Sequence, residues 1–122
     1  QHVLISGDIS FLYDSNAFSM NRFTQLQINS YSEYGGGIFQ IIPGPADSKQ
    51  REKYFEAKQT KSPAAIAQAF GRQTKIISSL EELTDYLPLF FDPSCETQVL
   101  EVQTDDANNA IDLDRYFEFL RN

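Results

Sequence analysis

The first ten residues carry the pattern that most constrains the fold. An apolar run at residues 3–5 is typical of a buried strand, and Gly7 and Asp8 follow it almost directly. Glycine lets the backbone turn sharply, so the next carboxylate is presented at the carboxyl end of the strand. That end of a strand is where α/β proteins hold metals and phosphates. We therefore predict a strand that turns into a helix, with Asp8 as the first candidate site residue.

Strand and helix patterns alternate along the remaining chain. Further strands are predicted at residues 24–34, 74–78 and 97–104. Within residues 24–34, polar and apolar residues alternate, which suits a strand with one covered face better than a central strand. Helices are predicted from Asp14 or Ser15 to Arg22, at residues 49–58, from Ser62-Pro63 to Gly71, from Ser79 to Pro88, and around Leu113, Tyr116, Phe117 and Leu120. Strands that alternate with helices imply right-handed crossovers and a parallel sheet. The fold class is therefore α/β, a three-layer sandwich with helices on both faces of a mostly parallel sheet.

Two of these helices have well-marked starts. Ser62 and Ser79 are typical N-cap residues, and residues 79–82 match a capping box. The apolar faces are expected to hold Ile66, Ala67, Ala69 and Phe70 in the first helix, and Leu80, Leu83 and Leu87 in the second. Pro88 is expected to kink or end the second helix because it has no backbone N–H to donate.

Charge and length narrow the class of protein. The chain has 17 acidic and 10 basic side chains and a net charge of -7, which argues against nucleic acid and anionic membranes as partners. At 122 residues it can bury one core, so a single domain spanning residues 1–122 is expected. Cys95 is the only cysteine, which fits a cytoplasmic protein. Met20 is the only methionine, so Gln1 is not a translation start. We therefore expect the chain to be a piece of a longer polypeptide, truncated at the amino end.

Three motifs in chain order carry a family resemblance. They are residues 7–17 (Gly-Asp-Ile-Ser-Phe-Leu-Tyr-Asp-Ser-Asn-Ala), residues 35–39 (Gly-Gly-Gly-Ile-Phe) and residues 99–105 (Val-Leu-Glu-Val-Gln-Thr-Asp). Together they resemble the carboxyl-terminal, diphosphate-binding domain of thiamine-diphosphate enzymes. Within these, the chain resembles the 2-succinyl-5-enolpyruvyl-6-hydroxy-3-cyclohexene-1-carboxylate synthase family of menaquinone biosynthesis. The resemblance spans nearly the whole chain and implies the thiamine-diphosphate-binding fold.

The resemblance also implies an activity. A synthase of this family is a transferase that decarboxylates 2-oxoglutarate and adds the succinyl-semialdehyde unit to isochorismate. Thiamine diphosphate serves as the electron sink, and Mg²⁺ or Mn²⁺ links its diphosphate to the protein. This chain would bind the diphosphate and the metal.

The metal site is the first part of the implied binding region. The resemblance makes Asp8 one ligand, gives Glu33 the position of the second ligand, and assigns the backbone carbonyl of Gly35 as the third. The family usually has an amide pair just before the glycine run, where this chain has Ser-Glu-Tyr at residues 32–34. Glu33 adds a negative charge beside the diphosphate, and Asn29 falls about four residues too early, inside the strand. Either this stretch is locally restructured or the metal site is impaired.

The cofactor contacts form the second part of the implied region. The resemblance assigns them to Gly7, Asp8, Ile9, Ser10, Gly35, Gly36, Ile38 and Phe39. Backbone N–H groups of Ile9 and Ser10 would face the phosphates, because donors in a first helical turn lack internal partners. Ile38 and Phe39 would form an apolar wall beside the thiazolium ring.

The resemblance places the catalytic glutamate of such enzymes elsewhere. It lies in a pyrimidine-binding domain that this chain does not contain, so no catalytic residue is expected here and the isolated chain is expected to be inactive. Full-length members of the family form homo-oligomers, so the chain is expected to expose an apolar patch.

A second function class remains open from the residues alone. The chain could be a non-catalytic α/β binding or regulatory domain with an acidic metal pocket around Asp8. The remaining chemistry-bearing residues have ordinary interpretations. His2 suits an exposed terminal position, Cys95 an inert thiol, Asp105 and Asp106 a solvated loop, and the aromatic pairs at 54–55, 90–91 and 116–117 core or interface packing.

Overall fold

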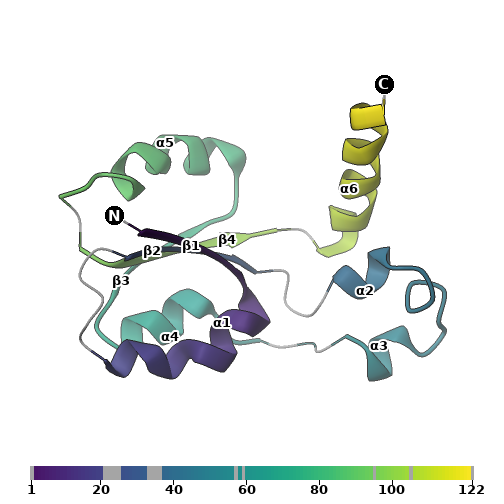
Figure 1. The fold of residues 1–122 in the computed structure, drawn as a ribbon, viewed down its shortest axis with the longest axis horizontal. Coiled ribbons are helices and arrows are strands. Elements are labelled where there is room, and N and C mark those ends of the chain that lie inside the picture. The colour runs from purple at the N-terminus through teal and green to yellow at the C-terminus, as the bar shows by residue number, and fades with distance from the viewer. Residues whose placement is uncertain are drawn as a thin grey trace. The chain divides into compact units, whose positions relative to one another are not determined.

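The computed structural model describes residues 2–20, 26–32, 37–56, 58, 60–94, 96–104 and 106–121. The chain forms two compact units, coloured along the sequence in Figure 1. We call Gln1–Ser32 with Lys61–Gln103 the sheet unit, and Glu33–Thr60 with Thr104–Asn122 the helical unit. Each is described by itself.

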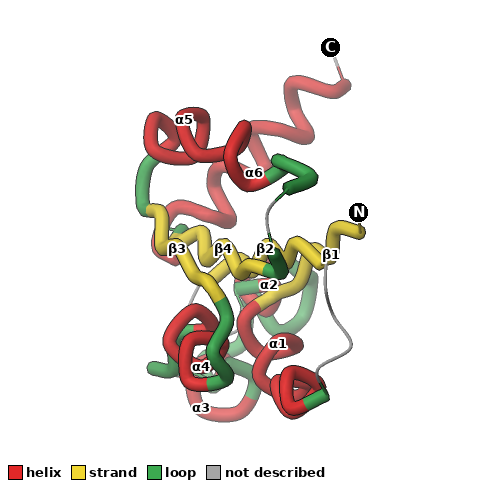
Figure 2. The backbone as a smooth tube through the Cα atoms, turned by 90° about the vertical axis from the view of Figure 1, so that its left-hand side faces the viewer, coloured by secondary structure: helices red, strands yellow, loops and turns green. Residues whose placement is uncertain are grey.

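A parallel sheet forms the centre of the sheet unit. Its four described strands are β1 (His2–Gly7), β2 (Leu26–Ser32), β3 (Gln73–Ile77) and β4 (Gln98–Gln103), in the order β1-β2-β4-β3. The helices of this unit are α1 (Asp8–Asp14), the 3₁₀ helix η1 (Ser15–Ser19), α4 (Pro63–Ala69) and α5 (Leu80–Phe90). Figures 1 and 2 show α1 and α4 on one face and α5 on the other. The predicted three-layer α/β class is confirmed.

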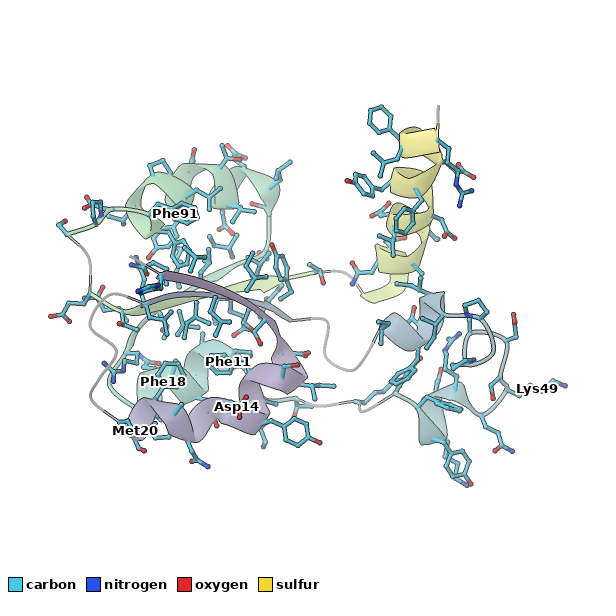
Figure 3. All side chains as sticks on the ribbon, in the orientation of Figure 1. Phe11, Asp14, Phe18, Met20, Lys49 and Phe91 are labelled. Carbon is cyan, nitrogen blue, oxygen red and sulfur yellow. The ribbon has the colours of Figure 1, made fainter. Side chains whose placement is uncertain are left out.

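Two apolar clusters hold these layers together. Phe11, Phe18, Ile28, Ala67 and Val99 pack between the sheet and the α1–α4 layer, and Ile77, Phe90, Leu100 and Val102 pack under α5. Val99 and Leu100 belong to different clusters because successive strand residues point to opposite faces. The rings of Phe11 and Phe18, labelled in Figure 3, lie 5.6 Å apart between their centroids.

Strand β2 differs from its prediction. It lies between β1 and β4 and is therefore a central strand, whereas the alternation at residues 24–34 predicted a strand with only one covered face. The prediction was wrong because it took the polar residues to mark an uncovered face. These side chains are buried in the structure: Gln27 is 1% exposed and Ser30 is fully buried. Polarity predicts exposure only where a side chain can reach water.

The first helix begins at the Gly-Asp turn, as the opening motif predicted, and not at the N-cap predicted later in the chain. Asp14 and Ser15 were the expected N-caps, but α1 starts at Asp8, directly after the extended N-cap Gly7. Residues 15–19 continue as the 3₁₀ helix η1. The end predicted at Arg22 lies outside the described residues. The helix begins directly after β1 because this places the rings of Phe11 and Phe18 in the core, where both are buried.

Helix α4 begins as predicted but buries a different face. Ser62 accepts a hydrogen bond from the N–H of Ala65 at 3.1 Å, as an N-cap does. The buried residues are Pro63, Ala64 and Ala67, whereas Ala69 and Phe70 are exposed and Ile66 is half-buried. The helix is only two turns long, so its last turn leaves the sheet before the predicted stripe is complete. Gly71 follows it with a φ of 75°, the left-handed conformation that glycine favours after a helix.

Helix α5 confirms the capping box but not its predicted end. Ser79 accepts from the N–H of Glu82, and the Glu82 carboxylate accepts from the N–H of Ser78. Pro88 does not end the helix, which runs to Phe90, because the N–H of Phe91 still bonds to the carbonyl of Leu87. Leu83 and Leu87 pack against the core, but the predicted third member of the stripe, Leu80, is 78% exposed at the first turn.

The helical unit contains the short helices α2 (Ile38–Ile41) and α3 (Arg51–Tyr54) and the long helix α6 (Asp106–Arg121). Helix α3 is a single turn within the predicted range 49–58. Arg51 pairs with the nearly buried Glu56 at 2.7 Å. Helix α6 lies where it was predicted, but its aromatic residues Tyr116, Phe117 and Phe119 remain exposed. Within the described residues, no helix combines the length and apolar character needed to span a bilayer.

Candidate functional site

The carboxyl ends of all four described strands lie at one edge of the sheet. Gly7 of β1 is opposite Tyr31 of β2, Tyr31 is opposite Val102 of β4, and Val102 is opposite Ile77 of β3. Because every pairing is parallel, the residues that follow these strands emerge on the same side. In open α/β sheets this edge is where ligands bind.

Asp8 is the predicted site residue that the structure places most clearly. It is the first residue of α1, directly beyond β1, and is only 3% exposed. Its carboxylate oxygen Oδ1 accepts a hydrogen bond from the N–H of Ile9 at 2.8 Å. An acidic side chain in a first helical turn is stabilised by the helix dipole. The strand-to-helix turn therefore holds this carboxylate in a fixed position at the edge of the sheet.

The turn that precedes Asp8 is open on the side of Gly7. A Cβ atom built on Gly7 would meet no atom within 4 Å, so the space beside this turn is open. Ser10 is exposed and Ile9 is half-buried. The N–H of Ile9, predicted to face a phosphate, is instead engaged by the Asp8 carboxylate in this structure. A carboxylate beside open space suits a hard divalent cation such as Mg²⁺.

The other predicted metal ligands are placed only in part. Glu33 and Gly35 lie outside the described residues, as does Gly36, so their roles stay predictions. Asn29 pairs with Ile5 and with Leu100 inside β2. It therefore lies within the strand, where the sequence placed it. Among the residues that the structure describes, no three His, Cys, Asp or Glu side chains gather as a metal site.

The predicted apolar wall belongs to the helical unit. Ile38 begins α2 and is 57% exposed, which leaves its side chain available for contact. Phe39 is half-buried, and its ring lies 5.7 Å from that of Phe55. Gly37, the last of the three glycines, is buried and precedes α2.

Sequence reasoning missed a cavity beside β1. It has a volume of about 250 Å³ and is mostly apolar, and its lining residues are Leu4, Ser6, Ser10, Phe11, Asp14, Ala17, Phe18, Leu26 and Ile28. Asp14 was predicted as a helix cap and instead lines this cavity. Of the apolar residues of β1, Leu4 lines this cavity and is 47% exposed, and no sequence pattern marked it.

A buried glutamate was also missed. Glu101 of β4 is fully buried, and its carboxylate accepts hydrogen bonds from the hydroxyl of Ser62 and the N–H of Ala64. Its position between the apolar residues Leu100 and Val102 in the sequence signalled burial, because a central parallel strand has both faces covered.

The remaining chemistry-bearing residues are described only in part. His2 is exposed at the start of β1, as predicted. Cys95 and Asp105 lie outside the described residues, and the side chain of Asp106 is not described. Of the aromatic residues expected in the core or an interface, Phe90 is in the core, and Tyr54 is 64% exposed.

Comparison with known proteins finds relatives that share one name. Proteins named 2-succinyl-5-enolpyruvyl-6-hydroxy-3-cyclohexene-1-carboxylate synthase match almost the whole chain: one from Porphyromonas gingivalis is 38% identical over 119 residues, 97% of this chain. The chain is homologous to one segment of this synthase family. Other relatives of that name come from Cytophaga hutchinsonii, 36% identical over 108 residues (88% of this chain), and Christiangramia forsetii, 34% identical over 119 residues (97%).

The match covers only part of each relative. This chain spans 19% of the Cytophaga synthase and 21% of each of the other two, about a fifth of their length. No protein-family model matches the chain.

Proposed function

We propose that this chain is the diphosphate- and metal-binding segment of a 2-succinyl-5-enolpyruvyl-6-hydroxy-3-cyclohexene-1-carboxylate synthase. Its homology to proteins of that name supports the family. The single structural observation that supports the role is the position of Asp8, a buried carboxylate held at the carboxyl edge of a parallel sheet beside open space.

Asp8 would be a ligand of Mg²⁺, and the metal would join it to the diphosphate of the cofactor. Thiamine diphosphate, when bound, supplies an electron sink for loss of CO₂ from a 2-oxo acid. The turn at Gly7 would let the cofactor approach the backbone. Ile38, exposed on α2, would offer an apolar contact that excludes water.

The whole reaction would need more than this chain. The glutamate that activates the aminopyrimidine would come from a pyrimidine-binding domain, and the substrates would be 2-oxoglutarate and isochorismate. The chain alone would bind cofactor and metal without turnover. Synthase activity measured with the purified 122-residue chain would contradict this division of roles.

Calorimetric titration tests the binding role. Thiamine diphosphate with Mg²⁺ is titrated into the wild-type chain, into Asp8→Asn, which keeps the shape and an acceptor for the N–H of Ile9, and into Asp14→Asn. Asp14 is a control because it lies on the same helix but is exposed. Affinity should fall about tenfold or more in Asp8→Asn, because the charged ligand oxygen is lost; tenfold corresponds to ~1.4 kcal/mol. Asp14→Asn should bind like wild type. No heat from the wild type, or equal affinity in Asp8→Asn, contradicts the proposal.

A further inference from the structure

The cavity beside β1 lies wholly within the sheet unit. Its described lining residues come from β1, α1, η1 and β2, all of them within residues 4–28. With a volume of about 250 Å³ it is larger than the cavities of ~150 Å³ that bind benzene. It can therefore take a six-membered ring that carries a short substituent.

Burial divides this cavity into a floor and a rim. Phe11, Phe18 and Ile28 are at most 6% exposed and form an apolar floor. Ser10 and Asp14 are exposed and form a polar rim. Phe11 and Asp14 lie three residues apart on α1, and Phe18 follows on η1 (Figure 3). A ligand would therefore enter with its apolar part first and leave its polar part at the rim.

The charge at the rim selects the polar part of the ligand. Asp14 is the only charged residue among the described lining residues, and it forms no ion pair with another described residue. Arg72, whose guanidinium lies 6.0 Å from the centroid of the Phe18 ring, is not among these lining residues. The net charge of -7 further favours a cation over an anion.

We propose that this cavity is a binding site for a small aromatic ammonium compound. The ring of the ligand would pack on Phe11 and Phe18, whose own rings lie 5.6 Å apart between their centroids. The ammonium group would pair with the carboxylate of Asp14. Burial of the ring would supply most of the affinity, whereas an ion pair at an exposed rim contributes less and sets the selectivity. The site does not depend on the proposed function, because it needs neither the metal nor Asp8.

NMR titration with benzylamine tests the site, since this compound carries one ring and one ammonium group. The backbone amide signals of Phe11, Ala17 and Phe18 should shift, with a dissociation constant in the millimolar range expected for so small a ligand. Benzoate, which has the same ring and the opposite charge, should bind about threefold more weakly or worse. No shifts at millimolar benzylamine, shifts confined to other parts of the chain, or equal affinity for benzoate would overturn the proposal.

Two variants that each remove one negative charge test the role of Asp14. Asp14→Asn should weaken benzylamine binding about threefold or more and leave the binding of neutral benzyl alcohol unchanged. Glu81→Gln is the control, because Glu81 is exposed on α5, which covers the other face of the sheet (Figure 1). It should bind both compounds like wild type. Equal losses of benzylamine affinity in the two variants, or wild-type affinity in Asp14→Asn, would contradict the ion pair.

A third variant tests whether the ligand occupies the cavity itself. Ala17 lines the cavity and is half-buried, so Ala17→Leu should fill part of the space. The folded variant, identified by its NMR spectrum, should lose the binding of both benzylamine and benzyl alcohol. Unchanged binding in the folded variant would overturn the proposal. If Ala17→Leu does not fold, the comparison of Asp14→Asn with Glu81→Gln still decides it.

Discussion

Gly7 and Tyr31 are direct partners in the parallel pairing of β1 with β2. The carboxyl ends of these two strands therefore lie at the same edge of the sheet. Asp8 follows Gly7, and the predicted ligand Glu33 comes two residues after Tyr31. Residues 8–30 separate Gly7 from its strand partner Tyr31 in the sequence, and the parallel pairing alone brings these two strand ends together.

The packing under α5 predicts that replacing one of two leucines by alanine lowers the stability far more than replacing the other. Leu100 is fully buried in β4, whereas Leu80 is 78% exposed at the start of α5. Leu100→Ala should lower the free energy of unfolding by about 2–5 kcal/mol, because it leaves a cavity. Leu80→Ala should change it by less than about 0.5 kcal/mol. Urea unfolding of both variants checks this, and a large loss in Leu80→Ala would contradict the position given to that side chain.

Substituting either of two glutamines that pair across neighbouring strands is predicted to have different effects on stability. Gln27 and Gln98 are partners across β2 and β4, and both are buried. The amide of Gln27 has no hydrogen-bond partner among the described residues, whereas Gln98 accepts from the hydroxyl of Tyr86 at 2.8 Å and donates to the carbonyl of Phe90. Gln27→Leu should leave the melting temperature unchanged or raise it, and Gln98→Leu should cost about 1–3 kcal/mol. Thermal unfolding of both variants tests this. A lower melting temperature in both would mean that the Gln27 amide has a hydrogen-bond partner.

The turn after α5 predicts a pH dependence. Ser94 donates to the Asp92 carboxylate from its hydroxyl at 2.6 Å and from its backbone N–H at 2.8 Å, and these bonds lower the pKa of Asp92 below 3.8. Because the pKa is lower in the folded state, the stabilisation is complete above 3.8 and is lost as the pH falls through the folded-state pKa. Carboxyl NMR titration should show this, and Ser94→Ala should raise the pKa back toward 3.8. A midpoint at or above 3.8 in wild type would contradict it.

The sequence predicted the elements of the sheet unit well where a local rule decided them. The caps at Ser62 and Ser79 depend on neighbouring residues only, and both are confirmed. Burial was harder, because it depends on partners distant in sequence. Polar Gln27 is buried and apolar Leu80 is exposed, and no local pattern carries that information.

In the candidate site, too, the residues marked by a local pattern were predicted, whereas contacts between distant residues were not. Asp8 was predicted from a strand followed by Gly-Asp, a signal contained within residues 3–8, and it lies at the expected edge. Glu101 could not be assigned its contact with Ser62, because 39 residues separate the two and only the sheet brings them together. Long-range hydrogen bonds leave no periodic trace in a sequence.

Manganese placed in the site tests the central claim most directly. Mn²⁺ replaces Mg²⁺ with thiamine diphosphate, and its paramagnetism broadens the NMR signals of nearby amides. The two ends of a six-residue strand lie on the order of 17 Å apart, enough to tell the edges of the sheet apart. We predict strong broadening at Gly7 and Ser10 and little at Leu26 and Gln73, with the effect lost in Asp8→Asn. Broadening centred on Leu26 and Gln73, or unchanged broadening in Asp8→Asn, would contradict the account.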